Sequence, residues 1–339
     1  MTTDVAPLPN TSAVRTRLWS AGALVAENFP LADVSRHVAE QGALVWVDLC
    51  NPDSALLTEL AGELGLDERA VRDVDGQRTK ATRYATHTFL TVYGTGVGPI
   101  IPGDIASRLL TARISIIVLP TAVVTVRHEN DPLRTVFDID EVVRRWDDNA
   151  DLLHRGSPAL LHEILDVVVD EQFDTIQQLD DAIESLEDEL FDDTGDNRTI
   201  QRNTYRLRKE LVELRRIVLP MREVVNTIRR SDTADLDGWY ADLYDNVIRA
   251  GEWTDSLRDM ITTVFETNLS LQDSRLNIVV KKLTGWAAII AVPTLVTGWY
   301  GQNVPYPGFS QISGVVTSAL LSVITSVVLY VMFRRRGWI

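Results

Sequence analysis

Two uncharged apolar stretches near the C-terminus constrain this 339-residue chain more than any other feature of its sequence. Residues 283–300 and 312–333 contain no Asp, Glu, Lys, Arg or His. At about 1.5 Å of rise per residue, helices of these lengths can cross a hydrocarbon core of about 30 Å, the first only just. We therefore expect a two-helix membrane hairpin whose short, uncharged connection, 301–311, lies on the far side.

Basic residues flank this hairpin at one end only. Lys281 and Lys282 precede the first stretch, and residues 334–336 are all arginine. Because basic residues beside membrane helices favour the cytoplasmic side, both ends of the hairpin are expected there. The polar start of the chain has no apolar signal-peptide core, so the hairpin is expected to be the segment that directs the protein to the membrane. The sequence thus predicts an integral protein of the cell membrane with two spans and cytoplasmic N- and C-termini.

Charge is divided unevenly along the chain. Residues 281–339 contribute +5 to the formal net charge of −15, which leaves −20 on residues 1–280. Such a polar part repels nucleic acid and attracts cations, so no nucleic-acid partner is expected. The single cysteine, Cys50, excludes an internal disulfide and suits a reducing cytoplasm.

The first half of the polar part has a mixed α/β pattern. Runs rich in β-branched residues predict strands, and helical spacing of apolar residues predicts helices. The glycine- and proline-bearing segment 94–103 is expected to be a loop. Strands are expected at 43–49, 86–93, 113–119 and 122–127, and helices at 52–64 and 132–146.

From Ser157 onward, apolar residues at alternating steps of three and four predict three long amphipathic helices. No Gly-Pro break separates the third of these apolar ladders from Leu283. We therefore expect one continuous helical rod of roughly 60 residues, on the order of 90 Å long, that runs into the membrane. Residues 163–193 hold thirteen carboxylates, and we expect them to form a solvated acidic arm beside the basic arm 202–230. The three ladders contain Ile176, Leu179, Ile183, Leu186 and Leu190; Leu207, Leu211, Leu214, Val218, Met221, Val225 and Ile228; and Leu243, Val247, Ala250, Leu257, Ile261, Val264, Leu271 and Ile278.

These patterns predict an α+β cytoplasmic domain followed by long α-helices and a C-terminal two-helix transmembrane hairpin. The expected divisions are an α/β domain (1–156), a helical hairpin (157–237), a long helix that becomes the first span (238–300), an external loop (301–311), a second span (312–333) and a basic tail (334–339).

The first span carries a stripe of small residues: Thr284, Ala287, Ala291, Thr294 and Gly298 recur at 3-4-3-4 spacing. One interpretation is close packing between membrane helices, which small residues permit. The other is one wall of a pore in an oligomer, because two helices per subunit cannot enclose a channel.

Neutral oxygen donors follow this stripe. Gln302 and Asn303 bear amides, and Gly298 and Gly301 leave backbone carbonyls accessible. Oxygens of this kind suit hard cations, and amides repeated around a ring could hold a magnesium ion through its own waters. The alternative is that Gly-Gln-Asn only makes a turn between two spans.

Tyr300-Gly301-Gln302-Asn303, followed by an aromatic and proline-bearing loop, a second span and a basic end, resembles the CorA family of magnesium transporters, whose signature here is Tyr-Gly-Met-Asn. Upstream, Tyr240-Ala-Asp242-Leu-Tyr244-Asp245 is similar to the acidic aromatic segment early in the family's pore helix. Weaker similarity covers Trp46-Val-Asp48 and Val124–Arg127. Two departures are Gln302 in place of methionine and an outer loop, 304–311, without the usual acidic residue.

The resemblance implies a homopentameric, funnel-shaped channel with a ring of Asn303 at its outer mouth. It further implies passive transport of magnesium, with cobalt and nickel as further cargo, and no cofactor. Membrane lipid and divalent cations would be its other partners. The residues expected to form the pore and its selectivity region are Asn277, Ala287, Ala291, Thr294, Gly298, Tyr300, Gly301, Gln302 and Asn303.

Intracellular magnesium bound between subunits would, by the same resemblance, hold the channel closed. Asp242 and Asp245 are the candidates for one side of that regulatory site, since carboxylates brought together at a subunit boundary need a cation to coexist. The alternative is that these aspartates only solvate a helix face.

Three other functions remain open from the residues. A zinc or other transition-metal transporter on the same scaffold, working with a proton gradient, is the nearest, but the five histidines are scattered and each is expected at the surface. A membrane-anchored coiled-coil scaffold would explain the ladders but not the small-residue stripe. An enzyme is the least favoured, because no nucleophile with an adjacent base is found. The histidines are His37, His87, His128, His154 and His162.

Overall fold

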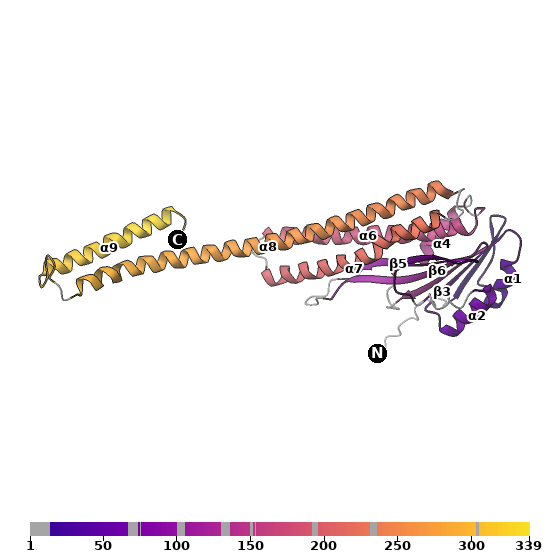
Figure 1. Ribbon diagram of the computed structural model, residues 1–339, viewed down its shortest axis with the longest axis horizontal. Helices are drawn as coiled ribbons and strands as arrows, with labels where there is room; N and C mark the ends of the chain where they lie inside the picture. Colours follow the sequence, from indigo (N-terminus) through magenta and orange to yellow (C-terminus); the bar gives the residue numbers. More distant parts are fainter. Residues whose placement is uncertain are drawn as a thin grey trace, which may run out of the picture. The chain divides into compact units, whose positions relative to one another are not determined.

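The computed structural model contains two compact units, Met1–Thr262 and Thr263–Ile339. The long helices predicted from the apolar ladders are present, and Figure 1 shows them as the magenta to orange segments. The structure describes residues 14–66, 74, 76–99, 106–129, 136–149, 152, 154–191, 196–230, 236–302 and 305–339.

A seven-stranded sheet forms the centre of the N-terminal unit, in the order β2-β1-β3-β7-β6-β5-β4. Strands β3 and β7 pair in parallel, and all the other neighbours are antiparallel. The four predicted strands are confirmed as β3, β5, β6 and β7, whereas β1, β2 and β4 were not predicted. The strands are β1 (Val14–Ser20), β2 (Ala23–Glu27), β3 (Ala43–Cys50), β4 (Lys80–Arg83), β5 (Thr88–Val97), β6 (Leu109–Val118) and β7 (Ala122–Glu129).

Alternation along the strands builds a separate core on each face of the sheet. In β3, Leu44 and Trp46 join the core beneath the long helices, whereas Val45, Val47 and Leu49 join the core beneath the short helices. This follows from the two-residue repeat of an extended chain, which sends successive side chains to opposite faces. The face with Trp46 is covered by α4, α6 and α7, and the other by α1 and α2 (Figure 1).

Apolar ladders position the long helices. The ladder residues of α6 and α7, and those of α8 up to Val264, are all buried, as expected for seams that pack together. Helix α8 is a single helix of 64 residues, so the predicted rod is confirmed. The helices are α1 (Val34–Val38), α2 (Ser54–Leu64), α4 (Ile139–Asp148), α6 (Ser157–Phe191), α7 (Asn197–Arg229) and α8 (Asp237–Tyr300), with a short 3-10 helix η1 (Leu31–Asp33).

The first part of segment 94–103 belongs to a strand, so the prediction of a loop was wrong for that part. Strand β5 continues through Gly94 to Val97, and residues 100–103 lie outside the described residues. A Cβ at Gly94 would lie 2.9 Å from Oε2 of Glu171 and 3.0 Å from Cβ of Phe137. Glycine is needed in this strand because α6 and the segment before α4 approach the sheet closely here.

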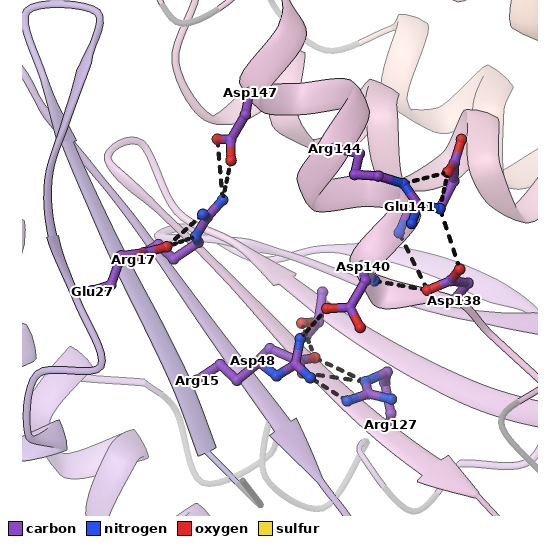
Figure 2. A network of polar contacts seen from close by, with 11 residues as sticks. Arg15, Arg17, Glu27, Asp48, Arg127, Asp138, Asp140, Glu141, Arg144 and Asp147 are labelled. Carbon is purple, nitrogen blue, oxygen red and sulfur yellow. Dashed lines mark hydrogen bonds and ion pairs between the residues drawn. The ribbon is translucent and has the colours of Figure 1, made fainter. Parts of the chain in front are cut away.

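A buried ion pair joins β3 to β7 under a polar network (Figure 2). The guanidinium of Arg127 donates to both carboxylate oxygens of Asp48, at 2.9 to 3.2 Å, and both side chains are almost fully buried. The hydroxyl of Thr125 also donates to Asp48, at 2.7 Å. Since a buried carboxylate must be paired, these contacts fix the register of the parallel pair. The two segments of weaker sequence similarity, 46–48 and 124–127, therefore lie on adjacent strands.

The acidic arm on α6 is not uniformly solvated, which corrects the prediction. Glu163 is buried, and this burial raises its pKa to about 6, assisted by nearby Asp166. Burial also raises the pKa of Asp166, and it raises that of Glu171 to about 8. Periodicity could not reveal this, because the covering atoms come from distant segments: one oxygen of Glu171 accepts from the backbone N–H of Asp138, at 3.0 Å.

Glu171→Gln tests the burial of this carboxyl. The folded-state pKa lies above the usual 4.5, so the folded protein should lose stability as pH rises from about 4.5 through about 8. Glutamine mimics the protonated acid. The variant should therefore match the wild type near pH 5 and be more stable near pH 9, by roughly 2 kcal/mol.

The readout is the apparent melting temperature of the purified chain, followed by tryptophan fluorescence across this pH range. Glu184→Gln, at an exposed position of the same helix, is the matched control and should follow the wild type. A Glu171→Gln profile parallel to that of the wild type would show that the carboxyl is ionised in the fold.

Candidate ion pathway

The C-terminal unit contains the end of α8 and helix α9 (Ile312–Arg335), drawn in orange to yellow in Figure 1. By length and composition, both helices are long and apolar enough to cross a membrane, with mean hydropathies of 1.5 and 2.2 in their most apolar windows. Few residues in these windows are buried in the single chain. The predicted hairpin is therefore present as two helices whose apolar surfaces are mostly exposed in the single chain.

The basic ends of the hairpin lie together. A Cβ at Gly285 would meet Ile339 at 3.1 Å, so the tail after α9 returns to the start of the first span. The rings of Trp286 and Tyr330 lie 6.3 Å apart, centre to centre, and join α8 to α9 at the same level. Lys281 and Lys282 are therefore near Arg334–Arg336 along the hairpin, which is the arrangement that a common cytoplasmic side requires.

The small-residue stripe faces away from α9. The buried Gly285 and the partly buried Ile289, Val292 and Val296 lie on the side of α8 that contacts α9. At about 100° per residue, the stripe lies roughly opposite to them on the helix. Close packing within the hairpin therefore does not explain the small residues. All five stripe residues are exposed, namely Thr284, Ala287, Ala291, Thr294 and Gly298.

Thr294 offers an oxygen on this exposed side. Its hydroxyl donates to the carbonyl of Ile290 one turn earlier, at 3.0 Å. Its proton is therefore used within the helix, and its lone pairs stay available to a water or an ion. Pro293, beside it, lacks the N–H that would bond the carbonyl of Ile289, which leaves a further backbone oxygen without its helical donor.

The first span ends in a tight backbone arrangement around Gly301. The N–H of Gly301 donates to the carbonyl of Thr297 at 2.8 Å, and that of Gln302 donates to Trp299 at 3.2 Å. A Cβ at Gly301 would lie 3.1 Å from the carbonyl oxygen of Thr297, closer than most side chains allow. The glycine therefore lets the chain leave the helix while the Gln302 side chain stays exposed.

An aromatic cluster supports this end of the helix, and the sequence did not single it out. The hydroxyl of Tyr306 donates to the carbonyl of Tyr300 at 3.1 Å, and the two rings lie 4.9 Å apart. Phe309 packs edge-on against Tyr306, at 5.4 Å. The cluster fixes the outer loop to the residue that begins the Tyr-Gly-Gln-Asn signature. The sequence showed that the loop contains aromatic residues and prolines, but it did not show these contacts.

Most of the predicted pore residues are exposed, and within one chain they do not form a closed site. Asn277, Ala287, Ala291, Thr294 and Gly298 are exposed on α8, as are Gly301 and Gln302 after it, and Tyr300 is partly buried. Asn303 lies outside the described residues. In a single subunit the described positions other than Tyr300 are therefore open to their surroundings.

The predicted regulatory aspartates lie close together on α8. Asp242 and Asp245 are both exposed and line a shallow depression of about 600 Å³ with Asn246, Ile248 and Arg249. Among the described residues of this chain, no group of three or more His, Cys, Asp and Glu side chains could hold a metal ion.

Two of the five histidines contradict the predicted surface positions. His87 and His162 are both buried. One ring nitrogen of His162 lies 3.2 Å from the carbonyl of Trp239, and burial lowers the pKa of His162. Its ring packs edge-on against Trp239 and Tyr240, which are far away in sequence. Spacing along the chain carried no sign of these contacts.

The family model of the CorA-like Mg²⁺ transporter protein matches residues 41–335. This chain belongs to that family. Its members are transporters, so the alternative of an enzyme is excluded. The predicted class of fold is confirmed by the complete structure of the CorA magnesium transporter from Methanocaldococcus jannaschii, which aligns with a TM-score of 0.73 over 97% of this chain and 99% of that one, at 21% identity.

The sequence relatives are named for the transport of different ions. The cobalt/magnesium transport protein CorA of Thermotoga maritima is 31% identical over 186 residues, which are 53% of this chain and 52% of that protein. The chain thus aligns with about half the length of that relative. The zinc transport protein ZntB of Yersinia enterocolitica is 27% identical over 300 residues, 84% of each chain.

Gly314→Ala tests the close packing of the outer loop. A Cβ at Gly314, in the first turn of α9, would overlap the carbonyl oxygen of Gly308, whose φ of +90° favours glycine as well. We expect the alanine variant to lose about 1–3 kcal/mol of stability through this overlap. Gly298→Ala is the matched control, because nothing lies within 4 Å of a Cβ there and alanine favours a helix.

The measurement is the apparent melting temperature of each variant in the same detergent. Gly298→Ala should equal or exceed the wild type. Equal melting temperatures for Gly314→Ala and the wild type would mean that the loop can move away from α9.

Proposed function

We propose that this protein is a passive, gated transporter of magnesium, with cobalt and nickel as further cargo, that acts as a homopentamer in the cell membrane. The observation that carries the proposal is the exposed stripe of small residues, which faces away from α9 and leads to Gly301 and Gln302. Membership of a family of divalent-metal transporters supports the cargo class. A relative named as a zinc transport protein is 27% identical to this chain, so the same family includes proteins named for another divalent ion.

Symmetry supplies the missing walls of the pore. One hairpin has two spans, of which only the first carries the stripe, so a single chain cannot surround a path. Copies arranged around an axis would set their stripes toward the centre, while α9 and the bulky residues of α8 meet lipid or neighbouring subunits. The small residues would then determine the width of the path.

Neutral oxygens would line this path. The hydroxyl of Thr294, the amide of Gln302 and the predicted amide of Asn303 recur once per subunit in such a ring. A hydrated magnesium ion holds its waters tightly, so oxygens that accept hydrogen bonds from those waters can select it without removing them. Movement needs no chemical energy source, because the membrane potential supplies about 2.3 kcal/mol per charge per 100 mV, twice over for a divalent ion.

Closure by intracellular magnesium would act through Asp242 and Asp245. Their carboxylates are exposed, and the one cation among the described residues that line their depression is Arg249, which bonds to Asn246. A neighbouring subunit that approaches this surface would bring acidic groups together, and a divalent ion between them would offset the repulsion. Loss of the ion would then loosen the subunits.

Asn303→Ala should lower magnesium entry into proteoliposomes at least about tenfold, because each subunit loses one amide of the ring at the outer mouth. The flux is followed with a magnesium-sensitive dye inside the vesicles, at equal protein content and equal oligomer size. Gln311→Ala, another amide of the same loop, is the matched control and should transport like the wild type. Normal flux in Asn303→Ala would remove the ring of amides from the proposal.

Asp242→Asn combined with Asp245→Asn should weaken inhibition by internal magnesium. The concentration needed for half-closure should rise about tenfold or more, since two carboxylates per subunit no longer attract the ion. Asp259→Asn, an exposed aspartate of the same helix, is the control. An unchanged inhibition curve in the double variant would exclude these aspartates from gating and leave the transport proposal intact.

Zinc transport driven by a proton gradient is the second candidate, favoured by the similarity to the Yersinia protein. The two candidates differ in competition and in driving force. For a magnesium pathway, cobalt and nickel should compete with magnesium, and a proton gradient should not change the rate of entry. Zinc uptake that rises with a proton gradient, without magnesium entry, would decide for the second candidate.

A further inference from the structure

The N-terminal unit contains a cationic cleft that the transport proposal does not use. The cleft has a volume of about 740 Å³ and lies between α7 and the face formed by β5, β6 and the segment before β4. Arg78 comes from that segment, Arg215 and Arg216 come from α7, and the ring of Tyr93 comes from β5. A volume of this size lies within the usual range for small-molecule sites, about 300–1,000 Å³.

Positive charge in this cleft is only partly balanced. Arg78 and Arg216 are exposed and form no ion pair with the described residues. Arg215 pairs with Asp255 of α8 at 2.6 Å, but both side chains are about 40% exposed, so this pair is readily exchanged. Glu213, the lining carboxylate, accepts from Ser107 at 2.8 Å and lies 4.0 Å from Lys209. Two arginines that form no ion pair with the described residues, beside a third whose pair is exposed, indicate a site for an anion in this chain of net charge −15.

A second cleft in the same unit contains arginines that are paired with carboxylates (Figure 2). That cleft has a volume of about 310 Å³ and is lined by Arg15 and Arg17. Arg15 bonds to Asp140, and Arg17 bonds to Glu27 and Asp147. Its guanidinium groups are already held by carboxylates, so that cleft offers no comparable attraction to an anion.

Tyr93 supplies a flat surface beside the arginines. Its hydroxyl donates to the carbonyl of Gln77 at 2.8 Å, which holds the ring in place. Burial raises the pKa of this phenol, although nearby Arg113 opposes the rise, so the ring stays neutral. Thr79 and Thr111 add hydroxyls to the lining. The lining also contains Pro220, which lacks the N–H that would bond the carbonyl of Arg216.

We propose that this cleft binds a small molecule with a chain of phosphates, either a nucleoside triphosphate or inorganic polyphosphate. The planar guanidinium groups of Arg78 and Arg216 match phosphate oxygens and bind them through paired N–H groups. Arg215 can join them by exchanging Asp255 for a phosphate. With a nucleotide, the base would lie against the ring of Tyr93, where aromatic surfaces stack. This proposal does not depend on which ion the membrane hairpin carries.

Binding is tested by calorimetry on the purified full-length chain, with adenosine triphosphate and with inorganic tripolyphosphate, in buffer that contains a chelator and no divalent ion. We expect saturable binding that weakens between low and high salt, because the contacts are ionic. Equal affinity for the two probes assigns inorganic polyphosphate, and tighter binding of the nucleotide, lost in Tyr93→Leu, assigns a nucleotide.

The double variant Arg78→Gln with Arg216→Gln should bind both probes at least about tenfold more weakly, which corresponds to about 1.4 kcal/mol. Arg208→Gln, an exposed arginine of α7 outside the cleft, is the matched control and should bind like the wild type. Because both substituted residues are exposed, an unchanged melting temperature shows that the double variant is folded. Absence of saturable binding to the wild type, or affinities within about twofold in the double variant, would overturn the proposal.

Discussion

The rest of the structure depends on the continuity of α8. One uninterrupted helix carries the apolar ladder of the N-terminal unit and then the first membrane span. Its ladder is buried as far as Val264, whereas Leu276, Ile278 and most later apolar residues are exposed. Exposed apolar surface on this scale needs lipid or another protein surface to cover it. The helix therefore joins a unit with its own core to a segment that is incomplete as a single chain.

The N-terminal unit accommodates several ionisable groups in its interior, and these constrain its geometry. Asp48 and Arg127 set the alignment of β3 with β7, where a shift by one residue would separate the pair and move side chains from one core to the other. Glu171 sits against Gly94, and its second carboxylate oxygen has no hydrogen-bond partner among the described residues. Such groups contribute little net stability, but they disfavour alternative packings that would leave a charge buried alone.

The features that could be predicted from the sequence are those that depend on the spacing of residues within one segment. The ladders of α6, α7 and α8 and the two spans could be identified because each repeats at helical intervals within one segment. Strands β2 and β4 could not, since they are short, lie at the sheet edges and carry no fully buried side chain. The burial of His162 under Trp239, and the bond from Tyr306 to Tyr300, depend on residues that only the fold brings together.

The chemistry of the hairpin favours a cation that keeps its water. Zinc sites use histidine, cysteine or carboxylate ligands, which displace water from the metal. Residues 283–333 contain no Cys, His, Asp or Glu, so in the proposed pathway they would offer zinc no such ligands. The proposed pathway instead has the hydroxyl of Thr294 on the side of α8 that faces away from α9, and the exposed amide of Gln302 after the helix. These groups accept hydrogen bonds from bound waters, which is the physical reason for proposing a hydrated magnesium ion as the cargo. Replacement of the signature methionine by Gln302 adds one more oxygen of the same kind.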